Sequence, residues 1–273
     1  MVRKTRRHPR SGSQFSGKSS LPSKVENGYE VVFGFHSVES VVRANPHRVI
    51  EVLIDARSGR RAREFSRYLD EQGVSYRAAS RDDITDELDN AVHQGVMARI
   101  KPEPPKDEAD LDRMLDNAEG PIFLLILDQI QDPHNLGACI RTADGAGVKG
   151  IVVTKNGSCP VNQTVRKVAA GAVDRMPVFY VSNLSRTLDD LKDRGVWITG
   201  ATDKGERELY DCDLTGNIAI AMGSEGKGLR RLTLEKCDQL AGIPMLGSVS
   251  SLNVSVATGV FLFEATRQRR SLR

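Results

Sequence analysis

The feature that most constrains the fold is an unbroken apolar run from Ile122 to Leu127, which ends at Asp128. The run does not alternate between apolar and polar residues, as a strand with one solvent-exposed face would. It is also far shorter than the roughly 20 residues of a membrane-spanning helix. Such a run is typical of a strand at the centre of a parallel sheet whose two faces are both covered.

The residues after this run continue a β-α-β pattern. A helix is predicted from Asn135 to Ala146 and a strand from Gly150 to Thr154, and crossovers of this kind are almost always right-handed. Further strands are predicted at Val178–Val181, Val196–Ala201, Ile218–Met222 and Leu240–Pro244, and helices at Arg186–Arg194, Leu229–Cys237 and Asn253–Arg269. Residues 120–273 are therefore predicted to form an α/β domain with a mostly parallel sheet.

A smaller β/α unit is predicted in residues 29–100. Its strands are expected at Val49–Asp55, Val74–Arg77 and Gly95–Ile100, and its helices at Ser37–Arg43, Arg61–Gln72 and near Asp82–Leu88. Residues 101–119 follow, and their first ten hold three prolines and several charges without apolar periodicity. This composition is typical of a linker between domains.

The basic charge of the chain is concentrated at its start. Seven Lys or Arg residues and no acid precede Glu26, whereas the rest of the chain carries more acidic than basic residues. Residues 1–26 hold few large apolar groups, so we expect a disordered tail. Two interpretations stay open: an arm that binds phosphate backbones, whose affinity would fall with salt, or a solubilising extension.

Composition also bears on metals, membranes and compartment. The four cysteines and five histidines show no metal-ligand spacing, so we expect no metal site and reduced thiols. No apolar segment follows the basic N-terminus, so neither a membrane span nor a secretory signal is expected. The predicted location is the cytoplasm.

Three loops of the second domain follow predicted strands, and ligands of open α/β sheets gather at the carboxyl ends of strands. The first loop leads into a helix that carries Asn135 and, six residues later, Arg141. This spacing puts the two side chains on neighbouring faces of the helix. The residues alone also allow Asn135 to be a helix cap and Arg141 a solvated surface residue.

The other two loops are rich in glycine and in serine. Residues 223–228 hold three glycines in six positions, which allow close approach of the backbone to a ligand but match neither a Walker loop nor a dinucleotide fingerprint. Glu225 within them could equally be a turn residue. The third segment offers Ser251, Asn253 and three further serines before a helix start. One of these caps the helix, and the five together exceed that need.

Taken together, the three segments resemble the signature motifs of the SpoU/TrmH-class (SPOUT) RNA 2′-O-methyltransferases. They read N-L-G-A-C-I-R at 135–141, M-G-S-E-G-K-G at 222–228 and S-V-S-S-L-N-V-S-V-A at 248–257. The resemblance extends from Tyr29 to the C-terminus. The segments A-V-H-Q-G at 91–95 and P-I-F-L-L-I-L-D at 121–128 are similar to those of family members that act on large-subunit ribosomal RNA.

The resemblance implies a fold and a set of partners. The C-terminal domain is expected to contain a deep trefoil knot that holds S-adenosyl-L-methionine in a bent form. The N-terminal module of the family implies an RNA-binding domain at 29–100. Members of the family also form homodimers, with the active site at the interface between the two knots. The implied substrate is 23S rRNA or a large-subunit precursor, at a guanosine of the peptidyl-transferase region.

The resemblance also implies site residues. Asn135, Arg141, Glu225, Ser251 and Asn253 form the expected catalytic set. Backbone groups of Gly223, Ile243 and Leu252 are expected to hold the cofactor's adenine. No metal is required, because the ribose 2′-hydroxyl attacks the sulfonium methyl directly.

Arg141 matches the arginine often assigned as the base, yet a guanidinium with a pKa above about 12 is normally not deprotonated. We therefore interpret Arg141 as the group that grips a phosphate beside the target ribose, while that phosphate or a perturbed guanidine accepts the proton. Asn135 and Glu225 are expected to orient Arg141 and the ribose. Ser251 and Asn253 are expected to bind or position the nucleotide.

Three alternatives to this function stay open. A tRNA enzyme or an antibiotic-resistance methylase would share all three motifs. A non-catalytic ribosome-assembly factor could keep the fold, although the intact motif residues argue against it. A nucleotide hydrolase is disfavoured because the Walker spacing is missing.

Overall fold

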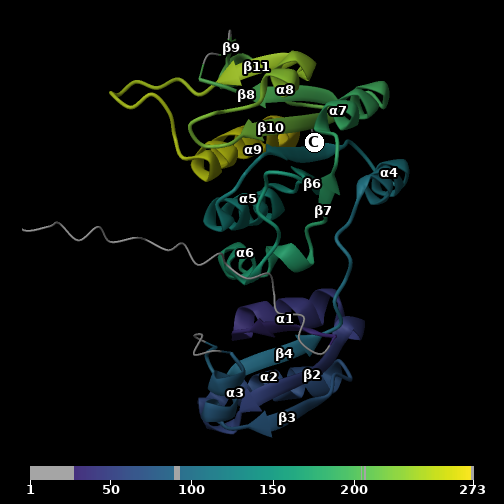
Figure 1. Ribbon diagram of the computed structural model, residues 1–273, viewed down its shortest axis with the longest axis vertical. Helices are drawn as coiled ribbons and strands as arrows, with labels where there is room; N and C mark the ends of the chain where they lie inside the picture. The colour runs from purple at the N-terminus through teal and green to yellow at the C-terminus, as the bar shows by residue number, and fades with distance from the viewer. Residues whose placement is uncertain (1–27, 89–92, 204, 206, 272–273) are drawn as a thin grey trace, which may run out of the picture.

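The chain folds into two α/β units, each with its own sheet and apolar core (Figure 1). The computed structural model describes residues 28–88, 93–203, 205 and 207–271. The predicted tail, residues 1–26, lies outside the described residues. The N-terminal sheet has four strands and the C-terminal sheet has seven.

The N-terminal unit is a mixed sheet with the strand order β1-β4-β2-β3. Its elements are β1 (Glu30–Phe33), α1 (Phe35–Ala44), β2 (Val49–Asp55), α2 (Gly59–Glu71), β3 (Tyr76–Ala79), α3 (Arg81–Glu87) and β4 (Val96–Ile100). β4 runs antiparallel to both of its neighbours, and β2 and β3 are parallel. Val38, Val41 and Leu69 are fully buried between the sheet and the helices α1 and α2, which explains the apolar spacing of these two helices.

The C-terminal unit is a parallel sheet with the strand order β7-β6-β5-β10-β8-β11-β9. Its strands are β5 (Phe123–Asp128), β6 (Gly150–Thr154), β7 (Val178–Val181), β8 (Trp197–Ala201), β9 (Arg207–Glu208), β10 (Ile218–Gly223) and β11 (Gln239–Gly242). Every residue of β5 is buried, and all its pairings are parallel. The α/β class and the parallel sheet predicted from the apolar run are confirmed.

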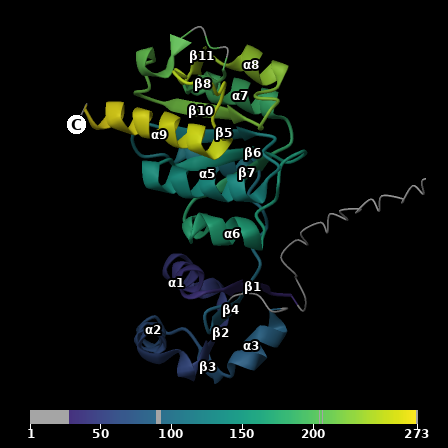
Figure 2. The same cartoon turned by 90° about the vertical axis from the view of Figure 1, so that its left-hand side faces the viewer.

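Helices cover both faces of this sheet. They are α4 (Glu108–Asp116), α5 (Pro133–Ala146), α6 (Gln163–Ala169), α7 (Leu184–Asp193), α8 (Arg231–Lys236) and α9 (Val254–Arg270). One core contains buried residues of α5, α6 and α9, and the other contains those of α4 and α7. Figure 2 shows α9, α5 and α6 one below another on one face of the molecule, with β1 beneath α6.

Helix α4 lies inside the stretch that the sequence assigns to a linker. Its start is fixed by a capping box between Asp107 and Asp110, and Leu111 and Leu115 are buried against the sheet. Pairs four residues apart share one face of a helix, but a single such pair next to three prolines gives a weak pattern. The stretch before α4 is also attached, because the backbone N–H of Tyr180 donates to the carbonyl of Lys106.

The two units contact each other through α1 and the turn η3 (Ala172–Asp174) that follows α6. The buried Ser40 hydroxyl donates to the carbonyl of Gly171 at 2.7 Å. Arg166 of α6 pairs with Asp174 at 2.8 Å and with Glu30 of β1 at 3.3 Å. Because a charge in a site of low polarity needs its partner, these contacts dock the units in one arrangement.

Candidate active site

The site begins where β5 and β10 end. In the parallel register Leu127 lies opposite Met222, and Asp128 lies opposite Gly223. The loops that follow both strands therefore leave from the same edge of the sheet. After β5 the side chain of Asp132 caps α5 by accepting from the N–H of His134 at 2.9 Å, so the cap that the sequence could assign to Asn135 is made by Asp132.

The loop after β10 is tight, and its glycines explain why. A Cβ at Gly223 would overlap the backbone of Gly228 and Leu229, so no larger residue fits there. Gly226 and Gly228 have φ of 76° and 66°, a region that favours glycine. The N–H of Gly228 donates to the carbonyl of Ser224 at 2.9 Å and closes the loop, which presents Glu225 at its tip.

Asp128 holds the far end of this loop, a role that the sequence analysis did not assign. Its buried carboxylate accepts from the Nε of Arg230 at 2.7 Å, from the N–H of Arg230 at 3.2 Å and from the Thr233 hydroxyl at 2.7 Å. Charged hydrogen bonds of this kind are among the stronger ones in proteins. The signal for this role is an acid that directly follows a wholly apolar strand.

Asn253 joins the three predicted segments. Its side-chain oxygen caps α9 by accepting from the N–H of Ser255 at 2.9 Å and from that of Val256 at 3.4 Å. Its side-chain nitrogen donates to Oδ1 of Asn135 at 3.0 Å and to the carboxylate of Glu225. The structure thus brings together Asn135, Glu225 and Asn253, which lie far apart in the sequence.

Arg141 and Ser251 lie near this trio without joining it. Arg141 is exposed on α5 and makes no hydrogen bond or ion pair with any residue that the structure describes. The carboxamide of Asn135 and the carboxylate of Glu225, expected to orient Arg141, instead contact Asn253. Ser251 is exposed in the segment that leads to α9. Arg141 is therefore available to an external anion.

A cavity of about 380 Å³ lies beside the trio, within the size range of small-molecule sites. Gly223, Ile243, Leu252 and Ser251 line it, as does Glu225. Its wall is otherwise largely apolar, and its polar members include the carboxylate of Asp203 and the ammonium group of Lys227. Such a cavity suits a flat, partly apolar ligand that carries a positive charge.

The cysteines lie outside this cavity. All four are free thiols, and three of them are buried. Burial raises the pKa of Cys139 to about 11 and that of Cys237 to about 12, so both stay protonated near neutral pH. Among the described residues, no cluster of His, Cys, Asp and Glu could hold a metal ion.

No helix in the described part of the chain has the length and apolar character to cross a membrane.

Two family models match the chain, one in each unit. Residues 122–263 match the SpoU rRNA Methylase family. Residues 31–106 match a domain described as RNA 2′-O ribose methyltransferase substrate binding. The first match contains all three predicted motifs, and the second covers the four-stranded sheet.

Curated relatives match almost over their full length. The chain is 50% identical over 241 residues to the 23S rRNA (guanosine-2′-O-)-methyltransferase RlmB of Pectobacterium atrosepticum, covering 88% of this chain and 98% of that one. It is 46% identical to the RlmB of Escherichia coli K12, covering 88% and 99%.

Solved structures share the arrangement. The SpoU methyltransferase AviRb from Streptomyces viridochromogenes, in complex with AdoMet, superimposes with a TM-score of 0.74 at 26% identity, covering 90% of this chain and 92% of that one. A protein described as acting in 2′-OH methylation of C/U34 on tRNA has a TM-score of 0.51 at 27% identity and covers 56% of this chain.

Proposed function

This chain belongs to the SpoU rRNA methylase family, and we propose that it methylates the ribose 2′-hydroxyl of a guanosine in 23S rRNA, with S-adenosylmethionine as the methyl donor. The observation that carries this proposal is identity of about half to RlmB over 98% of that protein's length, together with the joining of the three motifs at Asn253. We further propose a guanosine of the peptidyl-transferase region, as the resemblance implies, and a cytoplasmic location, because ribosomes are assembled there.

The N-terminal unit favours 23S rRNA over tRNA as the substrate. The tRNA-related structure matches only 56% of this chain, whereas RlmB matches both units. The substrate-binding model covers the N-terminal sheet except for Glu30, the first residue of β1. If the protein acted on tRNA through the C-terminal unit alone, the N-terminal unit would have no role in binding the substrate.

The cavity fits the cofactor on three counts. Its volume is that of a small-molecule site, and Gly223 lets the backbone of the loop approach closely. The carboxylates of Glu225 and Asp203 also suit a ligand with a sulfonium and an ammonium charge. The backbones of Gly223, Ile243 and Leu252 would hold the adenine. The bound cofactor supplies an activated methyl group.

The protein's own residues would place the nucleophile. Asn253 holds Asn135 and Glu225 at fixed positions beside the cavity, and Ser251 is free to contact the nucleotide. Arg141, unpaired among the described residues, would grip the phosphate next to the target ribose with its planar fork of donors. Placing the hydroxyl in line with the methyl group would supply much of the rate. The proton of the hydroxyl would pass to that phosphate or to the guanidine of Arg141.

We also propose that the protein acts as a homodimer through α9. Val256 and Phe263 are half exposed on this helix. They are seven residues apart, so they share one face. Leu246 and Val249, in the segment before α9, are 99% and 60% exposed. Exposed apolar patches of this kind mark interaction surfaces. A second copy over α9 would cover them next to the cavity.

A trefoil knot in the C-terminal domain is a further part of this proposal. Gln268, near the end of α9, donates to the carbonyl of Cys212 at 3.0 Å and accepts from the N–H of Leu214 at 2.9 Å. These bonds hold the segment before β10 across the last helix. If the chain is knotted, mechanical unfolding by pulling on its two ends should give an unfolded chain whose end-to-end length is shorter than that of a fully extended chain.

The proposed function is tested with methyl-labelled S-adenosylmethionine and unmodified 23S rRNA, 16S rRNA and tRNA. We expect label in a 2′-O-methylguanosine of 23S rRNA after nuclease digestion. Label in tRNA alone would reject 23S rRNA as the substrate. An absence of label with intact cofactor binding would favour a non-catalytic assembly factor.

A further inference from the structure

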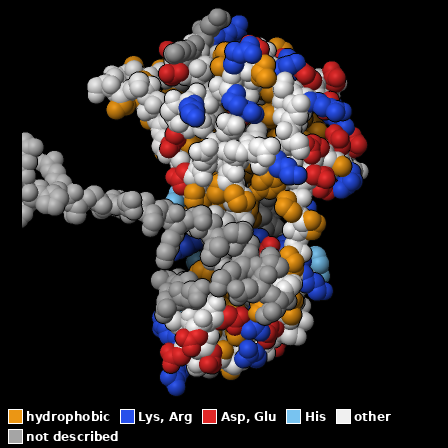
Figure 3. All heavy atoms as spheres, viewed as in Figure 1, with side chains coloured by type: hydrophobic (Ala, Val, Ile, Leu, Met, Phe, Trp, Pro, Cys, Tyr) orange, Lys and Arg blue, Asp and Glu red, His pale blue; other side chains and the backbone are white. Residues whose placement is uncertain are grey.

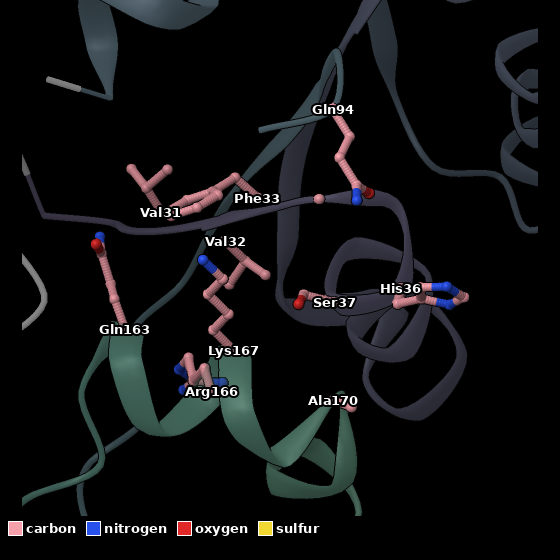
Figure 4. Close-up of a pocket in the computed structure, with 11 residues that line it drawn as sticks. Val31, Val32, Phe33, His36, Ser37, Gln94, Gln163, Arg166, Lys167 and Ala170 are labelled. Atoms are coloured by element: carbon pink, nitrogen blue, oxygen red, sulfur yellow. The ribbon is translucent and has the colours of Figure 1, made fainter. Parts of the chain in front are cut away.

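A second cleft lies where the two units meet, between α6 on one side and β1 and the start of α1 on the other. It has a volume of about 170 Å³, too small for most free metabolites but large enough for a phosphate and its ribose. Figure 4 shows Gln163 and Lys167 extending from α6 toward β1, with Ser37 and Gln94 on the other wall.

The charge of this cleft is positive. None of the described residues that line it is acidic, whereas Arg166, Lys167 and His36 are basic or can become so. Arg166 is neutralised by its ion pairs with Asp174 and Glu30. Lys167 is exposed and has no hydrogen-bond or ion-pair partner among the described residues. An anion would therefore meet one free ammonium group beside the amides of Gln163 and Gln94.

The walls of the cleft are held in place by buried contacts. The bond from Ser40 to Gly171 fixes α1 against the turn after α6, and a Cβ at Gly171 would collide with Ser40. Asn45, at the end of α1, donates to the carbonyl of Asp174 at 3.2 Å. The cleft is thus formed before a ligand arrives, which lowers the cost of binding.

The cleft lies on the same side of the molecule as the predicted catalytic residues of α5. Helices α5 and α6 pack so closely at Gly137 that a Cβ there would meet Val168 and the carbonyl of Val165. Arg141 is one turn beyond Gly137 along α5, and Lys167 adjoins Val168. The edge formed by α4 and α7 instead carries more acidic than basic side chains, and the two kinds are mixed there (Figure 3). It therefore offers RNA no comparable positive surface.

We propose that this cleft binds a phosphate and ribose of the rRNA strand that leads to the target nucleotide, with Lys167 on the phosphate and Gln163 and Gln94 on the sugar or base edge. The proposal rests on the proposed function and adds a contact shared by both units. RNA bound there bridges the substrate-binding unit and the methyltransferase unit. Non-bridging oxygens and 2′-hydroxyls are the groups that lysine and amide side chains recognise in RNA.

The test compares Lys167→Gln, Lys167→Glu and Lys167→Arg in the full-length protein, using a 23S rRNA fragment that the wild type methylates. For Lys167→Gln we expect the KM for RNA to rise roughly threefold to tenfold. The slope of log binding constant against log salt concentration should become less steep by about the amount that one phosphate contact contributes. The kcat and the affinity for S-adenosylmethionine should not change. Lys167→Glu should be worse, and Lys167→Arg should restore binding.

Arg186→Gln is the matched control, because it removes one exposed positive charge on α7, at the acidic edge. It should leave the KM and the salt slope as in the wild type. If Lys167→Gln behaves like Arg186→Gln while the wild type methylates the fragment, the cleft does not bind RNA and the proposed function stands. If the wild type methylates no RNA, the function itself fails.

Discussion

At the scale of single residues, Asn253 has two tasks that can be separated. Its oxygen caps α9, and its nitrogen ties Asn135 to Glu225. Asn253→Ala removes both, and loss of a cap costs about 1 kcal/mol of stability. Asn253→Asp keeps the cap but replaces the donor with a carboxylate that faces Glu225.

We expect both variants to lose methylation, with a larger fall in Tm for Asn253→Ala. Thermal unfolding and single-turnover methylation measure the two effects independently. Near-normal turnover of Asn253→Asp would show that the bridge is not needed for the reaction.

Arg141→Lys tests whether a planar fork is required on the phosphate. Lysine keeps the charge but presents a single point of contact, and misplacement of a reacting group by about 1 Å can cost about a hundredfold in rate. We expect kcat to fall on that order with unchanged affinity for S-adenosylmethionine, measured by calorimetry. Near-normal turnover would contradict a two-point grip on the phosphate.

The motif residues were visible in the sequence, but their contacts were not. The sequence placed Asn135, Glu225 and Asn253 in three loops, and their meeting depends on the register of β5 beside β10. The pairing of Asn135 with Asn253, and not with Arg141, depends on side-chain directions at a helix start. No spacing in the sequence encodes those directions. Asp128 was seen only as the end of a strand.

At the scale of elements, the loop after β10 depends on a single glycine. Gly223→Ala would push a methyl group into the backbone of Gly228 and Leu229, and overpacking of this kind costs about 1–3 kcal/mol. We expect weaker binding of S-adenosylmethionine, measured by calorimetry, because the loop must shift.

Gly145→Ala in α5 is the matched control. A Cβ at Gly145 meets only the Phe263 ring, at 3.9 Å, and alanine favours helix more than glycine. Cofactor binding should stay unchanged there. Equal affinities for both variants would contradict the role assigned to the close approach at Gly223.

Elements with a continuous apolar run were predictable, and a helix with few buried residues was not. The bounds of β2, β6 and β7 follow from their apolar runs, since turn residues flank each of them. Helix α6 escaped prediction because only Val165 and Ala169 of its seven residues are buried. A pair of apolar residues four apart is too little periodicity to distinguish a helix from a loop.

At the scale of the whole molecule, the exposed face of α9 predicts the oligomeric state. Phe263→Glu places a charge in the proposed contact between two copies, and we expect the protein to shift from dimer to monomer in analytical ultracentrifugation. Trp197→Glu, at a similarly exposed site on β8, should remain dimeric. A wild-type monomer at micromolar concentration would reject the proposed dimer.

The docking of the two units could not be predicted from the sequence. It depends on Ser40, Gly171, Arg166 and Asp174, which belong to different units or to a helix that the pattern did not reveal. Burial raises the pKa of Asp174, and the charge of Arg166 opposes that rise. The bonds from Ser40 to Gly171 and from Asn45 to Asp174 join the two units, so they form only after both units have folded.

The position of Asn253 in the chain also determines when the trio can assemble during synthesis. Asn135 and Glu225 emerge from the ribosome before Asn253 and α9, which follow them in the chain. At that stage the nascent chain contains Asn135 and Glu225 but lacks Asn253, the residue that links the two. The contact among the three side chains can therefore form only after Asn253 has left the ribosome.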